Sequence, residues 1–240
     1  MVDWNKQKKW IDFGITTYCN AACPGCPRTD EATLKHKVWL TPTHTNTKNL
    51  IEIFEKHKYF PDLESIRFCG ERGDPMMHPD IELLIDKVCN YKYDEDHEGF
   101  LCINTNGSLR TPDFYERIAE HTNLIIIFSI DGFEETNAIY RINLDWEPIF
   151  NNLSAFCHAG GGTRGGTNAC WDFIVWEHNW QDIPRVKEEA VTRESVPTRA
   201  SDLLIPRLYV LRHIPVDHHA DVRFVDAHPE CDRRDDDVDL

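Results

Sequence analysis

The sequence lacks any long hydrophobic run. Its longest apolar stretch, residues 124–130, is only as long as a strand, whereas a helix that crosses a membrane needs about 20 apolar residues. The basic residues near the N-terminus (MVDWNKQKKW) have no apolar segment behind them, so this start does not look like a secretory signal. These absences predict a protein without a membrane span, and we expect it in the cytoplasm.

Positive charge is scarce as well. The 240 residues include 26 Lys and Arg against 41 Asp and Glu, which gives a formal net charge of −15. Because such a surface repels phosphate backbones at long range, nucleic acid is not an expected partner, although a local basic groove for a specific RNA substrate stays open. The hydrophobic content of 41% and charged content of 28% are those of an ordinary globular protein with a sizeable core.

Strand-like and helix-like segments alternate along the chain. Hydrophobic periodicity predicts strands at residues 12–18, 65–69, 100–105, 124–131 and 171–176, with a sixth near 208–211. It predicts helices at residues 48–58, 80–90, 111–121, 134–140, 146–158 and 181–190. This order favours right-handed crossovers and a parallel sheet, and the chain is short for a complete eight-stranded barrel. We therefore predict an α/β fold, a partial (β/α)6-type TIM barrel with parallel strands.

The regular pattern weakens near residue 190. The last ten residues (CDRRDDDVDL) carry five aspartates and no helical face. We predict a barrel core over residues 1–190 and an irregular C-terminal segment with an acidic tail over residues 191–240. The tail's His213, His218, His219, His228 and Cys231 fit no compact metal-binding pattern. The glycine run at residues 160–166 lacks the ending of a phosphate loop and is interpreted as a flexible loop.

Three of the nine cysteines stand apart from the rest, because Cys19, Cys23 and Cys26 lie within eight residues, directly after the first predicted strand. Soft thiolates suit a 4Fe–4S cube, and a short loop can hold three of its irons from one side. A zinc site or an electron-transfer cluster would need a fourth ligand, whereas three ligands leave one iron open to a substrate or cofactor. The scattered cysteines beside apolar segments are interpreted as small buried hydrophobic residues: Cys69, Cys89, Cys102, Cys157 and Cys170.

The CxxxCxxC spacing resembles the signature of radical S-adenosylmethionine (radical SAM) enzymes. The resemblance implies that Cys19, Cys23 and Cys26 hold a 4Fe–4S cluster whose open iron chelates the methionine part of S-adenosylmethionine. It further implies reductive cleavage of this cofactor to a 5′-deoxyadenosyl radical, which abstracts a hydrogen atom from substrate. A small electron donor such as flavodoxin or ferredoxin would supply the electron.

Other segments at predicted strand ends resemble motifs of the same family. Arg72-Gly73-Asp74-Pro75 is similar to its Gly-Gly-Glu-Pro motif, with Arg and Asp in place of Gly and Glu. The resemblance makes Gly73, Asp74 and Pro75 the contact for the methionine amino group. Two further segments resemble the TNG and SxDG elements of the branch with peptide and cofactor maturases (SPASM/twitch-type): Asn104-Thr105-Asn106-Gly107 and Ser129-Ile130-Asp131-Gly132.

These motifs imply further cofactor contacts. Asn104 and Ser129 are candidates for the ribose or the methionine, and Arg141 is a candidate for the methionine carboxylate. Arg141 could equally be a surface cation at a helix end. Val175 and Asn179, in the late strand segment WDFIVWEHN, are candidates for the adenine, with a core residue and a cap as the alternatives.

The substrate stays open at this point. Resemblance to the maturase branch favours a peptide or protein, although the chain lacks that branch's cysteine-rich C-terminal extension, and a nucleotide or modified-base precursor is the second hypothesis. A non-catalytic iron–sulfur or zinc-binding module is a rival of another class. A further rival is an electron carrier, which would need a fourth ligand such as Cys69.

Overall fold

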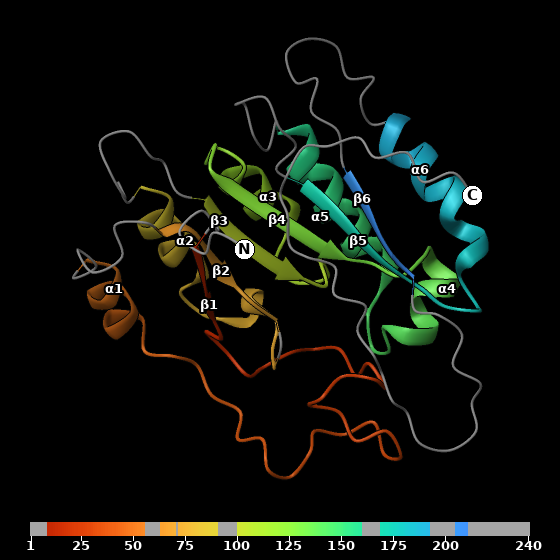
Figure 1. Ribbon diagram of the computed structural model, residues 1–240, viewed down its shortest axis with the longest axis horizontal. Coiled ribbons are helices and arrows are strands. Elements are labelled where there is room, and N and C mark those ends of the chain that lie inside the picture. The colour runs from red at the N-terminus through yellow and green to blue at the C-terminus, as the bar shows by residue number, and fades with distance from the viewer. Residues whose placement is uncertain are drawn as a thin grey trace, which may run out of the picture.

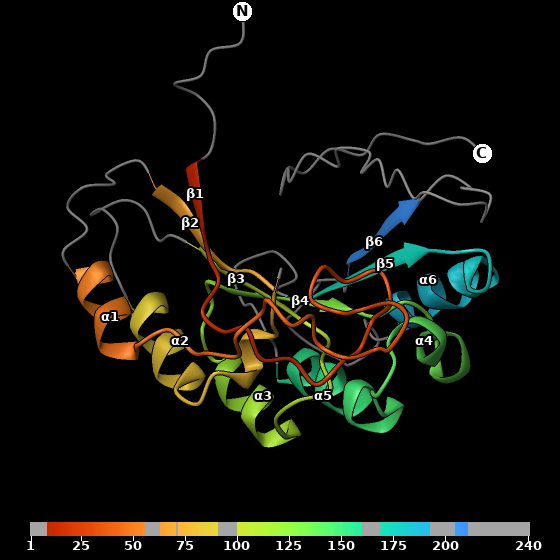
Figure 2. The same cartoon turned by 90° about the horizontal axis from the view of Figure 1, so that it is seen from below.

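Six parallel strands form one sheet. The computed structural model describes residues 9–55, 63–70, 72–90, 100–159, 169–192 and 205–210. Within them each strand pairs with the next along the chain, in the order β1 (Lys9–Phe13), β2 (Leu63–Phe68), β3 (Phe100–Thr105), β4 (Leu124–Ser129), β5 (Ala169–Val175) and β6 (Ile205–Val210). Figure 2 shows the sheet curving as an open arc with the helices on one side of it. This arrangement confirms the predicted partial barrel.

The helices connect successive strands. They are α1 (Thr47–Glu55), α2 (Ile81–Cys89), α3 (Pro112–Ile118), α4 (Glu134–Tyr140), α5 (Trp146–His158) and α6 (Ile183–Thr192), with short 3-10 turns η2 (Pro75–Met77) and η3 (Trp180–Asp182) (Figure 1). Predicted and observed bounds agree to the residue for β3, α4 and α5. Periodicity explains the success: α2 buries Ile81, Leu84, Ile85 and Val88, which are spaced to share one helix face.

The first strand differs from its prediction. Residues 12–18 were expected to form it, but β1 covers Lys9–Phe13 and pairs there with β2. The residues that follow bond to another segment, since Thr17 N donates to Thr43 O at 2.9 Å and Thr45 N donates to Ile15 O at 2.9 Å. Their extended backbone is therefore used in a local pairing outside the sheet. As a result Cys19 lies six residues after the end of β1 rather than directly after it.

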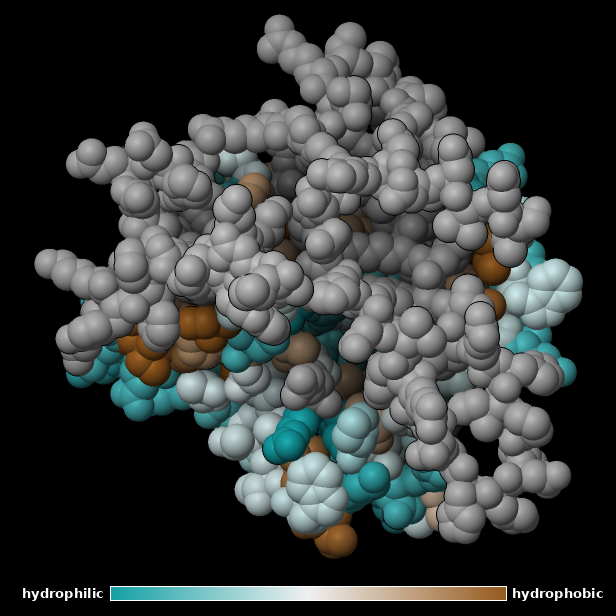
Figure 3. Space-filling view, viewed as in Figure 1, coloured by the Kyte–Doolittle hydropathy of each residue, from teal (hydrophilic) through white to brown (hydrophobic). Residues whose placement is uncertain are grey.

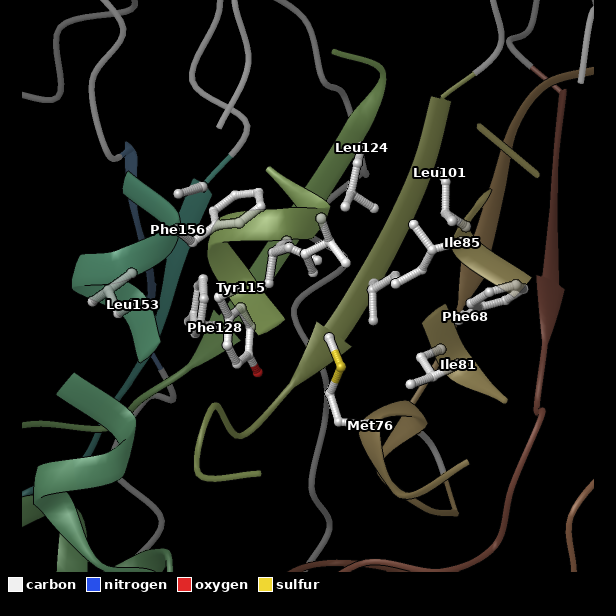
Figure 4. Close-up of a cluster of buried hydrophobic side chains, with 14 of the residues drawn as sticks. Phe68, Met76, Ile81, Ile85, Leu101, Tyr115, Leu124, Phe128, Leu153 and Phe156 are labelled. Atoms are coloured by element: carbon white, nitrogen blue, oxygen red, sulfur yellow. The ribbon is translucent and has the colours of Figure 1, made fainter. Parts of the chain in front are cut away.

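Alternate strand residues build the main core against the helices. Leu101, Leu124 and Phe128 are fully buried there, and Figure 4 shows such side chains meeting those of the helices between the ribbons. A smaller cluster of Cys102, Ile127 and Cys170 lies on the other side of the sheet. Cys102 and Cys170 are thus small buried residues, as predicted. Cys69, Cys89 and Cys157 are only partly buried.

The remaining sequence predictions concern the C-terminal part and the membrane. The glycine run 160–166, the acidic tail and the tail histidines lie outside the described residues, and the division at residue 190 stays a prediction. Strand β6 joins the edge of the sheet beside β5. Among the described residues no helix combines the length and apolar character that a membrane crossing requires.

Candidate cofactor site

The three clustered cysteines lie on a long loop, residues 14–46, which leaves β1 and runs past the C-terminal ends of the strands (Figure 1). Ala22 N donates to the carbonyl oxygen of Ile142, just beyond α4, at 3.0 Å, so the loop spans the sheet from its first strand to the α4 region. Cys23 is buried, while Cys19 and Cys26 are partly exposed, and all three are free thiols. The loop therefore brings the cysteines to the edge where parallel barrels bind ligands.

A single metal ion and an iron–sulfur cube make different demands on these cysteines. No group of three or more His, Cys, Asp or Glu among the described residues is arranged to hold one metal ion. In a 4Fe–4S cube each thiolate binds its own iron, so the three sulfurs do not need to converge on one point. The geometry of a single-ion site is therefore not what a cube requires of these cysteines.

Gly73 packs directly against the start of the cysteine loop. A Cβ atom on Gly73 would lie 2.3 Å from the carbonyl oxygen of Thr16 and 2.7 Å from that of Tyr18. The next residue, Asp74, donates its backbone N–H to the same Tyr18 oxygen at 2.7 Å. Because this close approach leaves no room for a side chain, glycine is required, and the turn after β2 fixes the residue that precedes Cys19.

The side chain of Asp74 locks two strand ends together. Its carboxylate is buried and accepts hydrogen bonds from Met76 N at 3.0 Å, from Asn106 N at 2.8 Å and from the Thr105 hydroxyl at 3.0 and 3.1 Å. Burial raises the pKa of Asp74, while the N–H groups of Asn106 and Met76 act to lower it. Asp74 thus joins the turn after β2 to the turn after β3.

A small amide network reaches the sulfur of Cys19. Asn106 Nδ2 lies 2.9 Å from Asn20 Oδ1 and 3.8 Å from Cys19 Sγ, and Asn20 Nδ2 donates to Ser108 Oγ at 2.8 Å. The backbone N–H of Ala21 points at the same sulfur at 3.4 Å. N–H groups around a thiolate are one of the means by which proteins set the properties of iron–sulfur clusters. Sequence reasoning singled out Asn104 in this segment and missed Asn106, whose place in the Asn-Gly turn was the available signal.

The side chain of Arg141 is largely covered and forms an ion pair with Asp131 beside Cys23. Its Nε donates to Asp131 Oδ2 at 2.7 Å, and the side chain of Arg141 retains only 14% of its exposure while that of Asp131 is fully buried. Arg141 thus lies at the end of α4, with its side chain largely covered and paired to Asp131, and its contact with the methionine carboxylate stays a prediction. Burial acts to lower the pKa of Arg141, but Asp131 and Cys23 outweigh it, so that the pKa is raised and the guanidinium stays charged.

The cysteine thiols respond to burial and to these neighbours. Burial, assisted by Asp74, raises the pKa of Cys19 to about 11, against the lowering effects of the Ala21 N–H and of Arg28. Burial likewise raises the pKa of Cys23, while the charge and hydrogen bond of Arg141 act to lower it. Metal binding requires deprotonated thiols, so these N–H groups and cations favour the form that can bind iron.

Asn104 and Ser129 share one face of the sheet. Asn104 lies opposite Ile127 in the β3–β4 register, and Ser129 follows two residues later on β4, so all three project to the side away from the helices. Both predicted side chains are partly exposed at the strand ends. They therefore lie where a ligand placed over the open side of the sheet could meet them.

Val175 and Asn179 occupy the end of β5. Val175 is partly buried and packs against the helix-side core. Asn179 is fully buried, and its side chain donates to Asp131 O at 2.8 Å and Ile174 O at 2.9 Å and accepts from Trp176 N at 2.6 Å. The side chain of Asn179 thus fixes the turn after β5 and ties it to Asp131.

An aromatic pair lies beside the cysteine loop. The rings of Tyr140 and Trp176 are 4.8 Å apart at an interplanar angle of 32°. The Tyr140 hydroxyl also fills the space beside Gly25, where an added Cβ would lie 3.0 Å from it. Sequence reasoning missed this pair because its members lie in two separate segments, at the ends of α4 and β5.

The segment after Cys26 forms the outer side of the loop. Leu34, Val38 and Trp39 are exposed there, and Arg72 lies over the Trp39 ring at 5.7 Å. Figure 3 shows apolar and hydrophilic side chains side by side at the lower edge of the molecule, where Figure 1 draws this loop. Arg72, which stands in the place of the motif's first glycine, therefore braces the outer loop from the Gly73 turn.

Solved structures of known proteins share this fold. The chain is similar to native anSMEcpe with bound AdoMet and Cp18Cys peptide, with a TM-score of 0.60 and 13% identity over 90% of this chain and 54% of that chain. It is also similar to Streptococcus suis SuiB bound to S-adenosylmethionine, with a TM-score of 0.54 and 13% identity over 84% of this chain and 37% of that one. At such low identity the likeness shows the fold alone.

A third similar structure, TYW1 with a lysine–pyruvate adduct bound, has a TM-score of 0.50 and 15% identity over 83% of this chain and 63% of that one. The chain thus spans about half the length of the first of these proteins and less than two thirds of the others. A search of the curated proteins gave no match.

A family model described as the radical SAM superfamily matches residues 13–186, which is well over half of the chain. The predicted cofactors, a 4Fe–4S cluster and S-adenosylmethionine, are those that this superfamily uses. The match includes the cysteine loop and the turns after β2, β3, β4 and β5. The chain therefore belongs to the radical SAM superfamily.

Proposed function

We propose that this protein is an enzyme that binds a 4Fe–4S cluster through Cys19, Cys23 and Cys26 and cleaves S-adenosylmethionine beside it. When bound and reduced, the cluster supplies the electron that splits the cofactor into methionine and a 5′-deoxyadenosyl radical, which abstracts a hydrogen atom from substrate. The observation that carries this proposal is the anchoring of the cysteine loop. Its start is held by the Gly73 turn, and Ala22 bonds to the segment that follows α4.

The donor set around the thiols fits an anionic cluster. The backbone N–H of Ala21 and the amide of Asn106 point at the sulfur of Cys19. Arg141 places its charge and a hydrogen bond beside Cys23. Such N–H groups and cations stabilise thiolates, which are the ligand form that iron requires. We infer that the loop is shaped to hold deprotonated cysteines.

The neighbouring residues are proposed to bind S-adenosylmethionine. Gly73, Asp74 and Pro75 would present backbone carbonyls to the methionine amino group. The carbonyl oxygens of Asp74 and Pro75 each accept one backbone N–H within η2, and a carbonyl oxygen can accept a second hydrogen bond. Arg141 is held through Nε by Asp131, and its other N–H groups are suited to a bidentate contact with the methionine carboxylate.

The cofactor's nucleoside part would extend over the open face of the sheet. We propose Asn104 and Ser129 as contacts for the ribose or the methionine, because both lie partly exposed on that face. Val175 and Asn179 are proposed for the adenine end. Because the amide of Asn179 is buried, this residue would position the turn beside the adenine rather than contact the adenine directly.

A peptide or protein is the proposed substrate. The TNG-like and SxDG-like strand ends support it, and one structural neighbour holds a peptide together with AdoMet. A small electron carrier such as flavodoxin or ferredoxin is the proposed reductant, and the cytoplasm is the proposed location. The protein's own part in the reaction is to orient the cofactor and shield the radical from water.

The test begins with anaerobic reconstitution by iron and sulfide, followed by dithionite and S-adenosylmethionine. We expect the wild type to form 5′-deoxyadenosine and Cys23→Ala to lose the product together with the cluster. Cys69→Ala is the matched control, because Cys69 lies outside the loop at the end of β2 and should leave both unchanged. Zinc at about one ion per chain, without binding of S-adenosylmethionine, would instead support the non-catalytic binding module. Loss of the cluster in Cys69→Ala would support the electron carrier.

A further inference from the structure

Arg28 is a fully buried cation two residues after Cys26. It is 2% exposed, and its guanidinium NH1 donates to the carbonyl oxygens of Ala21 at 3.1 Å and Cys19 at 3.5 Å. NH2 lies 2.8 Å from His36 Nε2, and Nε is buried without a hydrogen-bond partner. Arg28 therefore holds the backbone of the cysteine loop by hydrogen bonds from inside the protein.

The charge of Arg28 is not balanced by a carboxylate. None of the ion pairs among the described residues includes Arg28, and its acceptors are neutral carbonyl oxygens and an imidazole. His36 must accept through Nε2 in this contact, and accordingly burial and the charge of Arg28 lower the pKa of His36. Removing a guanidinium from water is unfavourable unless an anion lies close by, so buried charges are normally paired.

Arg141, the second arginine of the site, has a carboxylate partner that Arg28 lacks among the described residues. The side chain of Arg141 is also largely covered, but it forms a 2.7 Å ion pair with Asp131. Arg28 has the cysteine loop in that position instead, and its charge acts on the Cys19 thiol. We therefore expect the negative charge that balances Arg28 to lie in the cysteine loop.

We propose that Arg28 is the counter-charge of the bound iron–sulfur cluster and the residue that positions its loop, an inference that rests on the proposed function. A 4Fe–4S core with three thiolates is negative overall, and reduction adds one further negative charge. A fixed, desolvated cation beside it stabilises the reduced form more than the oxidised form. Arg28 thereby makes the cluster easier to reduce.

The test measures the cluster and does not depend on turnover. Arg28→Gln retains a hydrogen-bond donor for the loop and removes the charge, whereas Arg28→Lys retains the charge. After reconstitution, iron content and a potentiometric titration followed by electron paramagnetic resonance give cluster loading and midpoint potential. We expect the ratio of reduced to oxidised cluster in Arg28→Gln to fall about tenfold at a fixed potential, equivalent to about 59 mV for a one-electron couple. Arg28→Lys should recover most of this loss.

Arg117→Gln is the matched control. Arg117 is exposed and paired with Glu82, so its loss should leave the midpoint potential unchanged. A wild-type potential in Arg28→Gln would overturn the proposal. If Arg28→Gln fails to load, Arg28→Lys decides: loading with a near-normal potential supports a role for the charge, and failure to load contradicts it. A wild type that binds no cluster would instead refute the proposed function.

Discussion

Two buried aspartates fix the two sides of the candidate site, and they do so by different means. Asp74, after β2, accepts from two backbone N–H groups and one hydroxyl, all of them neutral. Asp131, after β4, accepts from Ile174 N at 2.9 Å and from the guanidinium of Arg141. The Asp74 side is thus held by the backbone of adjacent turns, and the Asp131 side by an ion pair.

The difference has a chemical meaning. The Asp74 side lies against the start of the loop, where the position of the backbone matters and a free charge would serve no purpose. On the Asp131 side the protein must keep a cation buried beside Cys23, so the carboxylate neutralises part of the cost of that burial. The Asp131 side therefore depends on a buried ion pair, whereas the Asp74 side depends on hydrogen bonds from neutral donors.

Breaking the ion pair should have the largest effect. Asp131→Ala leaves the guanidinium of Arg141 buried and unpaired, and we expect the free energy of unfolding to fall by about 3–5 kcal/mol. Denaturant unfolding monitored by circular dichroism measures this loss. Asp12→Ala is the control, because Asp12 forms a more exposed pair with Arg67 and should cost only about 0–1 kcal/mol. Equal losses in the two variants would refute the distinction.

Crowding the backbone contact on the Asp74 side should come next. Gly73→Ala forces a methyl group to within 2.3 Å of the Thr16 oxygen, so the turn and the cysteine loop must separate. We expect a loss near 3 kcal/mol, at the upper end of the usual cost of overpacking, together with reduced iron loading. Gly14→Ala is a matched control, since nothing lies within 4 Å of an added Cβ there. Normal iron loading in Gly73→Ala would show that this contact does not position the loop.

Local pattern was sufficient to predict most of the fold. The alternation of apolar segments fixed the order of strands and helices, because the helix faces and strands repeat their burial at regular intervals. It was wrong for the first strand, where the extended segment around Thr16 and Thr17 pairs with residues 43–45. That pairing joins residues almost thirty positions apart through backbone groups, which leave no trace in side-chain periodicity.

Site residues were predictable where the chemistry requires a particular residue type. They were less predictable where a residue's role depends on its position in the folded chain. The cysteine spacing and the glycine of the Gly73 turn were recognisable from the sequence. Arg28 was missed because arginines are mostly exposed, and only the folded chain reveals that this one is buried. The ion pair of Arg141 with Asp131 was likewise not predictable, since a helix end carries no mark of what covers it.

The smallest expected effect concerns the protonation of Asp74. In Asp74→Asn the amide group replaces one oxygen, so either Met76 N or Asn106 N loses its acceptor, at a cost of about 1–2 kcal/mol. Because burial raises the pKa of Asp74 in the folded protein, the stability that the wild type gains from this carboxyl is complete below pH 3.8 and declines as the pH rises through the folded value. Asparagine has no such dependence.

The difference in unfolding free energy between the wild type and Asp74→Asn should therefore narrow as the pH is raised from about 4, the unfolded value of an aspartate. Urea unfolding of both proteins at several pH values measures it. A difference that widens with pH would mean that the three hydrogen-bond donors hold Asp74 ionised and outweigh its burial. The Asp74 side would then rest on a buried charge after all, with backbone N–H groups taking the place that Arg141 has beside Asp131.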